Sequence, residues 1–170
     1  MSNYILKTAR LSLRKFTTQD ASFIFNLLNS EDWIKYIGNR NINTLKEAED
    51  YIISVFLKSY DDASIGYYVV ENNEDKIPMG ICGLVKRTYL DELDYGFAFL
   101  PQYMNQGYAF EISNEFFQYA KNQLNIKRLY AITVSYNLRS IKLLEKLDFK
   151  FQHHIHPEED EELMIYNLNL

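Results

Sequence analysis

The segment best suited to chemistry is Met104-Asn105-Gln106-Gly107-Tyr108-Ala109, which follows an aromatic strand ending at Pro101. The small residues Gly107 and Ala109 would let free N–H groups at a helix start approach an anion, which the helix dipole also favours. The segment is therefore a candidate diphosphate cradle, that is, a loop whose backbone N–H groups bind a diphosphate. On spacing alone, an ordinary strand-to-helix loop is favoured. It is neither a Walker A loop, because no Gly-Lys-Ser/Thr follows, nor a dinucleotide fingerprint, because only one glycine is present.

Other reactive side chains lie near the C-terminus. His153, His154 and His156 suggest a metal site, but no cysteine supports them, so we expect no metal and place them beside a groove. The acidic run 157–162 is expected to be a solvated hairpin turn, with attraction of cationic substrates as the alternative. Cys82 lies within a strand and is expected to be a buried, small apolar residue.

Hydrophobic periodicity predicts the elements that must position these residues. We expect strands over residues 5–16, 65–71, 77–86, 91–100, 126–134, 149–155 and 163–169. We expect helices over residues 17–28, 44–56, 107–123 and 138–147, the first two beginning with the capping-box pairs Thr17/Asp20 and Thr44/Glu47. This order implies an α/β (mixed α+β) fold with a mixed seven-stranded sheet and helices on both faces.

Bulk properties narrow the class of protein. The 170 residues correspond to a single domain, 1–170. The net charge of −5 and the scattered basic residues argue against nucleic-acid binding. One cysteine excludes an internal disulfide framework, and no apolar run reaches the ~18 residues of a membrane span. Because the N-terminus lacks a signal-peptide pattern, we expect the protein to be cytoplasmic. We expect it to be a monomer or a homodimer.

Four segments in register resemble the GNAT acetyltransferase superfamily. Met104–Ala109 resembles its coenzyme-A loop, Arg/Gln-x-x-Gly-x-Gly/Ala, and Asp94-Tyr95-Gly96-Phe97 resembles its Glu-Ile-Gly-Tyr strand. Asn137-Leu138-Arg139-Ser140 with Glu145-Lys146-Leu147-Asp148-Phe149 is similar to its Asn-x-x-Ser…Glu-Lys-Leu-Gly-Phe helix. Thr8-Ala9-Arg10-Leu11-Ser12-Leu13-Arg14 resembles the opening strand of the ribosomal-protein-alanine acetyltransferase (RimJ/RimL-like) branch. The resemblance covers nearly the whole chain and implies a mostly antiparallel sheet with a central splay.

The resemblance also implies a reaction and a set of binding residues. Acetyl-coenzyme A would be the co-substrate, and its acetyl group would pass directly to an amine acceptor without a metal or a covalent enzyme intermediate. A free N–H near Phe97 would hydrogen-bond the thioester oxygen as it gains charge. The implied coenzyme-binding residues are Phe97, Ala98, Phe99, Met104, Asn105, Gln106, Gly107, Tyr108, Ala109, Asn137 and Ser140.

Three positions depart from the family pattern. Met104 stands where Arg or Gln is usual, so no polar side chain reinforces the loop there. Asn105 replaces a frequent glycine, which restricts close approach of the backbone. Asp148 replaces the glycine after the last helix, where a left-handed cap is expected to affect stability more than chemistry.

The resemblance implies catalytic roles for Asp94, Asn137 and Ser140. Asp94 is the candidate general base, acting through water, with a salt-bridged or solvated strand carboxylate as the alternative. Glu92 lies on the same predicted strand face and is the reserve. Ser140 would hydrogen-bond the coenzyme sulfur and return a proton, while Asn137 would cap its helix or present its amide to the coenzyme.

The acceptor stays open between several amines. Neutralising a lysine-like amine at pH 7 costs ~4.6 kcal/mol, whereas an α-amine costs only ~1 kcal/mol, so a weak base suffices for a peptide N-terminus. We therefore favour a protein N-terminal α-amine. A polyamine or other small amine is the alternative within this chemistry, and a non-catalytic coenzyme-A-binding regulatory module is the alternative outside it. By resemblance Trp33, Tyr36 and Ile37 border the acceptor, although an aromatic core is the favoured explanation for them.

Overall fold

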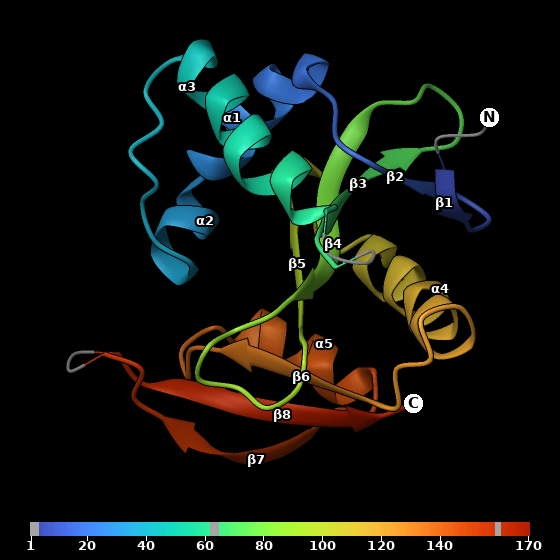
Figure 1. Cartoon of the computed structure of the whole chain (residues 1–170), viewed down its shortest axis with the longest axis vertical. Helices are drawn as coiled ribbons and strands as arrows, with labels where there is room; N and C mark the ends of the chain where they lie inside the picture. Colours follow the sequence, from blue (N-terminus) through green and yellow to red (C-terminus); the bar gives the residue numbers. More distant parts are fainter. Residues whose placement is uncertain (1–3, 62–64, 159–160) are drawn as a thin grey trace.

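The computed structural model describes residues 4–61, 65–158 and 161–170, arranged around one eight-stranded sheet (Figure 1). Its strand order is β1-β2-β3-β4-β5-β6-β8-β7. All neighbours pair antiparallel except β5 and β6, which are parallel, so the predicted mixed, mostly antiparallel sheet is confirmed. The strands are β1 Tyr4–Lys7, β2 Leu11–Arg14, β3 Tyr67–Asn72, β4 Pro78–Val85, β5 Asp94–Phe99, β6 Arg128–Thr133, β7 Lys150–Ile155 and β8 Leu163–Asn169.

Helices cover both faces of this sheet, as predicted (Figure 1). The residues that pack on one face come from α1 to α3, and those on the other face come from α4 and α5. The helices are α1 Ala21–Leu28, α2 Glu31–Tyr36, α3 Leu45–Tyr51, α4 Tyr108–Asn122 and α5 Leu138–Lys146. Two 3₁₀ helices, η1 Thr18–Asp20 and η3 Pro101–Tyr103, and a π-helix, η2 Ile52–Leu57, complete the helical elements of the described residues.

The sheet is split between β5 and β6. The register pairs Asp94 with Tyr130, and Tyr130 N–H donates to Leu93 O at 2.9 Å. Beyond this pair the register records no further partners, and Figure 1 shows β3 to β5 running upright while β6 to β8 cross beneath them. The predicted central splay is therefore present, and it leaves the rest of β5 without a neighbour on that side.

The count of seven strands was wrong, because the predicted strand 5–16 is two strands. Thr8 makes the turn between them: its N–H donates to Leu11 O at 2.8 Å, and its Oγ1 accepts from Leu11 N–H at 3.0 Å. A Thr side chain that bonds the backbone nearby competes with extended structure. Alternating apolar residues on both sides of this turn hid it from periodicity.

Two helical features differ from the sequence prediction. α2 was not predicted, because its six residues bury only Trp33 and so carry no apolar stripe. The Thr44/Glu47 capping box is confirmed, with Glu47 N–H donating to Thr44 Oγ1 at 3.1 Å and Thr44 N–H donating to Glu47 Oε2 at 2.9 Å. The predicted helix 44–56 then changes to π geometry over Ile52–Leu57.

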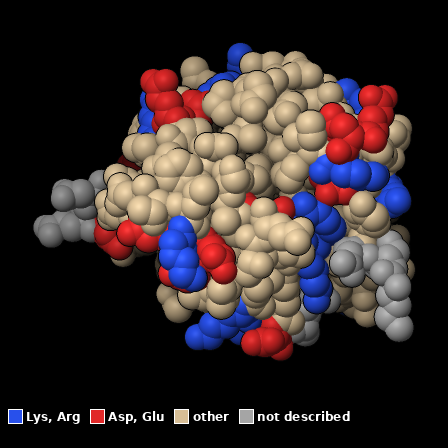
Figure 2. All heavy atoms as spheres, turned by 90° about the horizontal axis from the view of Figure 1, so that it is seen from above, with Lys and Arg blue, Asp and Glu red and all other residues tan. Residues whose placement is uncertain are grey.

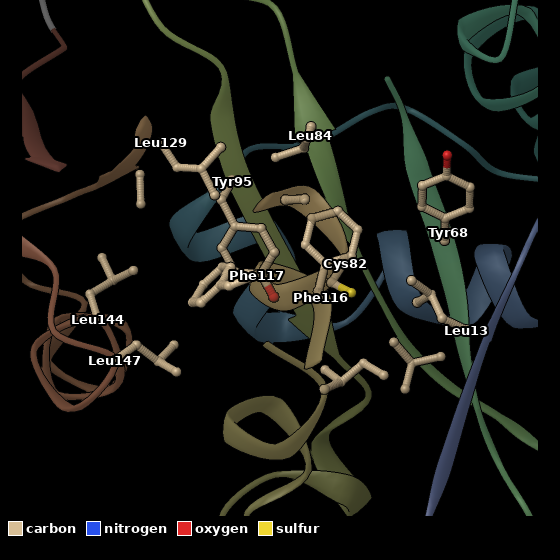
Figure 3. Close-up of a cluster of buried hydrophobic side chains, with 14 of the residues drawn as sticks. Leu13, Tyr68, Cys82, Leu84, Tyr95, Phe116, Phe117, Leu129, Leu144 and Leu147 are labelled. Atoms are coloured by element: carbon tan, nitrogen blue, oxygen red, sulfur yellow. The ribbon is translucent and has the colours of Figure 1, made fainter. Parts of the chain in front are cut away.

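Alternation along the strands divides the core between the two faces. On β3, Tyr68 and Val70 belong to the cluster under α4 and α5, whereas Val69 belongs to the cluster under α1 to α3. Figure 3 shows the first cluster, in which Tyr95 and Phe117 lie at the centre. Because this cluster also contains residues of β6 and α5, one core joins the strands on both sides of the split.

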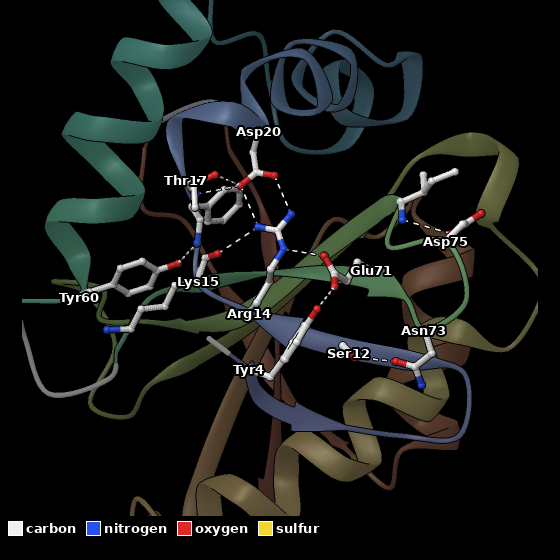
Figure 4. Close-up of polar contacts among 12 residues, drawn as sticks. Tyr4, Ser12, Arg14, Lys15, Thr17, Asp20, Tyr60, Glu71, Asn73 and Asp75 are labelled. Carbon is white, nitrogen blue, oxygen red and sulfur yellow. Dashed lines mark hydrogen bonds and ion pairs between the residues drawn. The ribbon is translucent and has the colours of Figure 1, made fainter. Parts of the chain in front are cut away.

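A buried charge network joins β2, β3 and the start of α1 (Figure 4). Arg14 donates to both oxygens of Asp20, at 2.9 and 2.8 Å, and to Glu71 Oε2 at 2.6 Å. Tyr4 Oη donates to the other Glu71 oxygen at 2.8 Å. The predicted Thr17/Asp20 pair is also present, since Thr17 N–H donates to Asp20 Oδ2 at 2.8 Å, but it starts η1 before α1.

Figure 2 shows Lys, Arg, Asp and Glu interspersed around one face, with uncharged residues between them.

Cys82 is buried, as predicted, and burial raises the pKa of its thiol to about 12. His154 and His156 approach Glu162 at 3.8 and 3.4 Å, and the described residues contain no group of His, Cys, Asp or Glu that could hold a metal ion. No helix in the described parts has both the length and the apolar character needed to cross a membrane.

Replacing Arg14 should test the buried network. The side chains of Asp20 and Glu71 are only 5% and 3% exposed, so Arg14→Met leaves two buried carboxylates without their cation. We expect the free energy of unfolding, measured with urea, to fall by about 3–5 kcal/mol. Lys46→Met is the control, because Lys46 is 69% exposed and its removal should cost at most about 0.5 kcal/mol. Equal losses in the two variants would contradict a structural role for the network.

Candidate active site

A cleft of about 390 Å³ lies between β5, the loop before α4, α2 and the start of α5. Ten of the eleven residues predicted to bind coenzyme line it, although they come from three separate parts of the chain. These ten are Phe97, Ala98, Phe99, Met104, Asn105, Gly107, Tyr108, Ala109, Asn137 and Ser140. The cleft therefore brings together the loop, strand and helix segments that the sequence singled out.

Gln106 is the one predicted residue outside the cleft. Its side-chain Nε2 donates to Gln102 O at 2.7 Å, and its own carbonyl accepts from Arg10 Nη1 at 3.1 Å. Both contacts tie Gln106 to protein rather than to the cleft.

Two left-handed residues shape the loop before α4. Asn105 has φ +58° and Gly107 has φ +80°, a conformation that glycine and asparagine adopt most readily. A Cβ at Gly107 would meet only Arg10 Nη2, at 3.4 Å, so the backbone conformation rather than crowding requires glycine. Asn105 thus meets the conformational need of this loop in place of glycine.

Gly107 is also the N-cap of α4, which is 15 residues long. Glu111 N–H donates to Gly107 O at 3.0 Å. The N–H groups of Tyr108, Ala109 and Phe110 donate to no acceptor in the described part of the chain. Free N–H groups at the positive end of a helix dipole can bind an anion. The predicted diphosphate cradle therefore has the backbone groups that it needs.

The free edge of β5 faces the split in the sheet. Leu100 N–H donates to Met79 O at 2.9 Å, so the alternation of the ladder turns the N–H groups of Gly96 and Ala98 toward β4. The N–H groups of Phe97 and Phe99 then face the side from which β6 has diverged. A donor is thus available at Phe97, where one was expected.

A second cavity of about 830 Å³ lies between β5, β6 and the loop that joins β7 to β8. It shares Tyr36, Ile37, Phe97, Asn137 and Ser140 with the cleft, so the two spaces meet at these residues. A molecule in the cleft and a molecule in the cavity would contact each other there. This is the geometry that a transfer between two substrates requires.

Asp94 lines this second cavity and is buried. Its Oδ2 accepts from Arg87 Nε at 2.9 Å, while its buried Oδ1 has no hydrogen-bond partner among the described residues. Burial raises the pKa of the Asp94 carboxyl, while the Arg87 guanidinium and, to a smaller extent, the backbone N–H of Ile132 lower it by less. Of the two alternatives for Asp94, the structure therefore shows an ion pair and also a free carboxylate oxygen beside the cavity.

Glu92 lies before β5 and does not line either space. Its Oε1 is 3.9 Å from Arg128 Nη1 at the surface. The strand begins at Asp94, so the period-two argument that placed Glu92 on the same face does not apply.

The start of α5 places Asn137 and Ser140 between the two spaces. Asn137 is the N-cap, because its Oδ1 accepts from Ser140 N–H at 3.2 Å. Ser140 Oγ donates to no described residue and remains available to a ligand. At the other end of α5, Asp148 has φ +66°, the left-handed cap that was expected where the family has glycine.

Several cavity residues were missed by the sequence analysis. Arg139 bonds Asp32 of α2 and approaches Met104 Sδ at 3.2 Å, so it bridges the cleft where the usual polar loop side chain is lacking. Tyr67 lies against Gly96, where a Cβ would be 2.2 Å from its Oη. Arg40 and Arg87 line the second cavity with it. The contacts of Arg139 with Asp32 and Met104 join parts of the chain 107 and 35 residues apart, so no local pattern marks them, although Arg139 itself lies within the Asn137–Ser140 motif.

The aromatic and acidic segments that were left open also reach the site. Trp33 is buried in the core, which was the favoured interpretation, and it lines the cleft but not the second cavity. Tyr36 and Ile37 line both spaces. Glu158 and Glu161 are exposed, as expected of a solvated turn, and they also line the second cavity; residues 159–160 of the acidic run lie outside the described residues.

Known proteins resemble the chain in sequence and in fold. It is 28% identical to the uncharacterized N-acetyltransferase YoaA of Bacillus subtilis over 149 residues, covering 86% of this chain and 82% of that protein. The spermidine N-acetyltransferase of Vibrio cholerae, solved in complex with CoA and spermine, shares the fold with a TM-score of 0.77 at 21% identity, over 95% and 96% of the two chains. The ribosomal-protein-S5-alanine acetyltransferase of Vibrio fischeri has a TM-score of 0.77 at 15% identity, over 96% and 95%. At such identities the two structures establish the fold alone.

Individual relatives at 28% identity or less do not show the family of this chain, but a family model does. The acetyltransferase (GNAT) domain matches residues 10–150, which include the loop before α4, all of β5 and the start of α5. Members of this family use acetyl-coenzyme A and transfer its acetyl group to amines. The chain therefore belongs to the GNAT acetyltransferase family and is an acyltransferase enzyme.

Proposed function

We propose that this enzyme acetylates the N-terminal α-amine of a protein or peptide, as the ribosomal-protein-alanine branch of its family does. The observation that carries the proposal is the junction of the cleft and the second cavity at Phe97 and Ser140. We assign the cleft to acetyl-coenzyme A and the cavity to the amine. The acetyl group then passes directly between them.

The residues of the cleft fit the coenzyme in both charge and shape. The free N–H groups at the start of α4 suit its diphosphate. The unpaired edge of β5 suits an arm that contains amides, because such an arm can take the hydrogen bonds that a neighbouring strand would make. When bound, acetyl-coenzyme A supplies the thioester, and the Phe97 N–H is the donor that stabilises negative charge on its oxygen.

Asp94 is the proposed base. Burial raises the pKa of its carboxyl by more than the ion pair with Arg87 lowers it, so Asp94 is a stronger base than an ordinary carboxylate but is still weak beside an amine. The free Oδ1 can accept a proton from the acceptor through water. A base of this strength suits an α-amine, for which neutralisation costs only ~1 kcal/mol at pH 7, better than a lysine-like amine at ~4.6 kcal/mol.

Ser140 and Asn137 act on the coenzyme side. We assign to Ser140 the return of a proton to the departing sulfur, because its hydroxyl lines both spaces. A thiol with a pKa near ~8.5 needs little assistance to leave, so this role is auxiliary. Asn137 holds the first turn of α5 and thereby fixes the position of Ser140.

A small cationic amine such as a polyamine is the second candidate acceptor. Glu158 and Glu161 on the cavity wall favour it, because carboxylates attract a second positive charge. Arg40 and Arg87 line the same cavity and oppose that attraction, but Asp94 lines it too, so three acidic side chains stand against two basic ones. This small acidic excess favours a cation weakly, whereas the free energy of deprotonation favours the α-amine.

An amine panel tests the function. Purified protein is incubated with acetyl-coenzyme A and an Ala- or Ser-starting peptide, the same peptide with its N-terminus blocked, or spermidine, and released thiol is measured. We expect release only with the free peptide. Release with spermidine alone would establish the second candidate, and coenzyme binding without release for any amine would indicate a non-catalytic binding module.

Substitution of Gly107 tests the diphosphate cradle. Gly107→Glu places a side chain on a left-handed residue and a negative charge beside the proposed diphosphate, so coenzyme-A binding by calorimetry should be abolished. Gly38→Glu is the matched control, since Gly38 has φ +109° with open space around it and lines neither cavity. Unchanged affinity in Gly107→Glu would remove the cradle from this loop.

Substitution of Asp94 tests the base. Asp94→Asn removes the acceptor of the proton, so deprotonation must come from solvent and the rising limb of the pH–rate profile should move to higher pH. We expect kcat/KM at pH 7 to fall roughly 10²-fold. Glu92→Gln should leave the profile in place, because Glu92 lies outside both spaces. An unshifted profile in Asp94→Asn would clear Asp94 of this role.

A further inference from the structure

Arg10, in the turn between β1 and β2, contacts the start of α4 at several points. Its Nε donates to Glu111 Oε2 at 2.6 Å and its backbone N–H to Glu111 Oε1 at 2.9 Å. Thr8 Oγ1 adds a third bond to that carboxylate, at 2.6 Å. The turn is therefore fastened to the first turn of a helix 101 residues away in sequence.

The other end of the Arg10 guanidinium reaches the loop itself. Nη1 donates to Gln106 O at 3.1 Å, and the guanidinium carbon lies 4.4 Å from the centre of the Tyr108 ring. Nη2 lies 3.4 Å from where a Cβ on Gly107 would be. One side chain thus contacts or borders three consecutive residues at the mouth of α4.

These contacts bear on an anion at the helix start in two ways. The bond to Gln106 O holds one carbonyl of the loop, which would otherwise be free to turn toward the anion and repel it. The pair with Glu111 offsets a carboxylate in the first turn of α4. Burial raises the pKa of Glu111, but its bonds from Thr8 and Arg10 lower it by more, so the carboxylate stays ionised at neutral pH and needs that offset.

The exposure of the pair separates this role from a structural one. The side chains of Arg10 and Glu111 are 47% and 21% exposed, in contrast to the buried partners of Arg14. An ion pair at such a surface adds little to global stability, typically about 0–1 kcal/mol. Its loss should therefore appear mainly in ligand binding.

We propose that Arg10 is a positioning residue for the coenzyme diphosphate. It orders the loop 104–109 and cancels the charge of Glu111, so that the N–H groups at the start of α4 meet a diphosphate in a neutral to positive surrounding. The inference rests on the proposed assignment of this loop to coenzyme A, and it adds a residue that the loop motif does not contain.

Calorimetric titration with coenzyme A tests the proposal without knowledge of the acceptor. We expect Arg10→Met to weaken binding about tenfold or more, while the thermal midpoint stays within a few degrees of the wild type. Arg10→Lys keeps the charge but loses the forked contacts, so its affinity should lie between the two. Arg128→Met is the matched control, since Arg128 is also 47% exposed and bonds Glu92 and Asn169 far from the loop.

The double variant Arg10→Met/Glu111→Gln supplies the decisive comparison. If Arg10 acts in part by offsetting Glu111, removal of that carboxylate should recover part of the lost affinity. Wild-type affinity in Arg10→Met, or a double variant no better than the single one, would overturn the proposal. If the wild-type protein itself does not bind coenzyme A, the proposed function fails together with the inference; if only the Arg10 comparison fails, the proposed function stands.

Discussion

The divergence of β5 from β6 is the constraint on which the rest of the structure depends. The register ends at the pair Asp94–Tyr130, and the remaining edge of β5 then has no strand beside it. Backbone N–H and C=O groups that leave a sheet need other partners, and this edge presents its own to the space between the two halves. Both cavities lie along the opening, and Phe97 lines both of them. The interruption of the sheet is thus what makes room for the two cavities.

Packing on one face of the sheet keeps the opening in place. Tyr95 is buried on β5, and its hydroxyl is 2.7 Å from Ser113 Oγ on α4. Phe117 of α4 contacts both the Tyr95 ring, at 4.8 Å, and the Phe149 ring beyond α5, at 5.7 Å. Residues from both sides of the split therefore share one close-packed core, and such cores resist deformation. The halves are separated at the strands and joined through the helices beneath them (Figure 3).

Buried charge is used in two different ways. Arg14 meets two carboxylates, and the network holds the first strands to α1 (Figure 4). Arg87 meets only one oxygen of Asp94. In the described part of the chain, the buried side-chain atoms without a hydrogen-bond partner are Asp94 Oδ1 and Trp33 Nε1, and both residues line the cavities. Unsatisfied buried polar atoms are rare in folded proteins, so their position supports a site that a ligand completes.

The sequence by itself determined the features that depend on neighbouring residues. The Thr44/Glu47 cap and the glycine before α4 are visible because caps and left-handed turns have local residue requirements. Resemblance to a family extended this to the mostly antiparallel sheet with its central splay and to ten residues of the cleft. The turn at Thr8, the helix α2, the partner of Asp94 and the contact of Arg10 with Glu111 were decided only by the tertiary structure. Each depends on polar contacts of particular side chains or, for α2, on a helix too short to show a stripe of apolar residues, and hydrophobic periodicity carries no information about either.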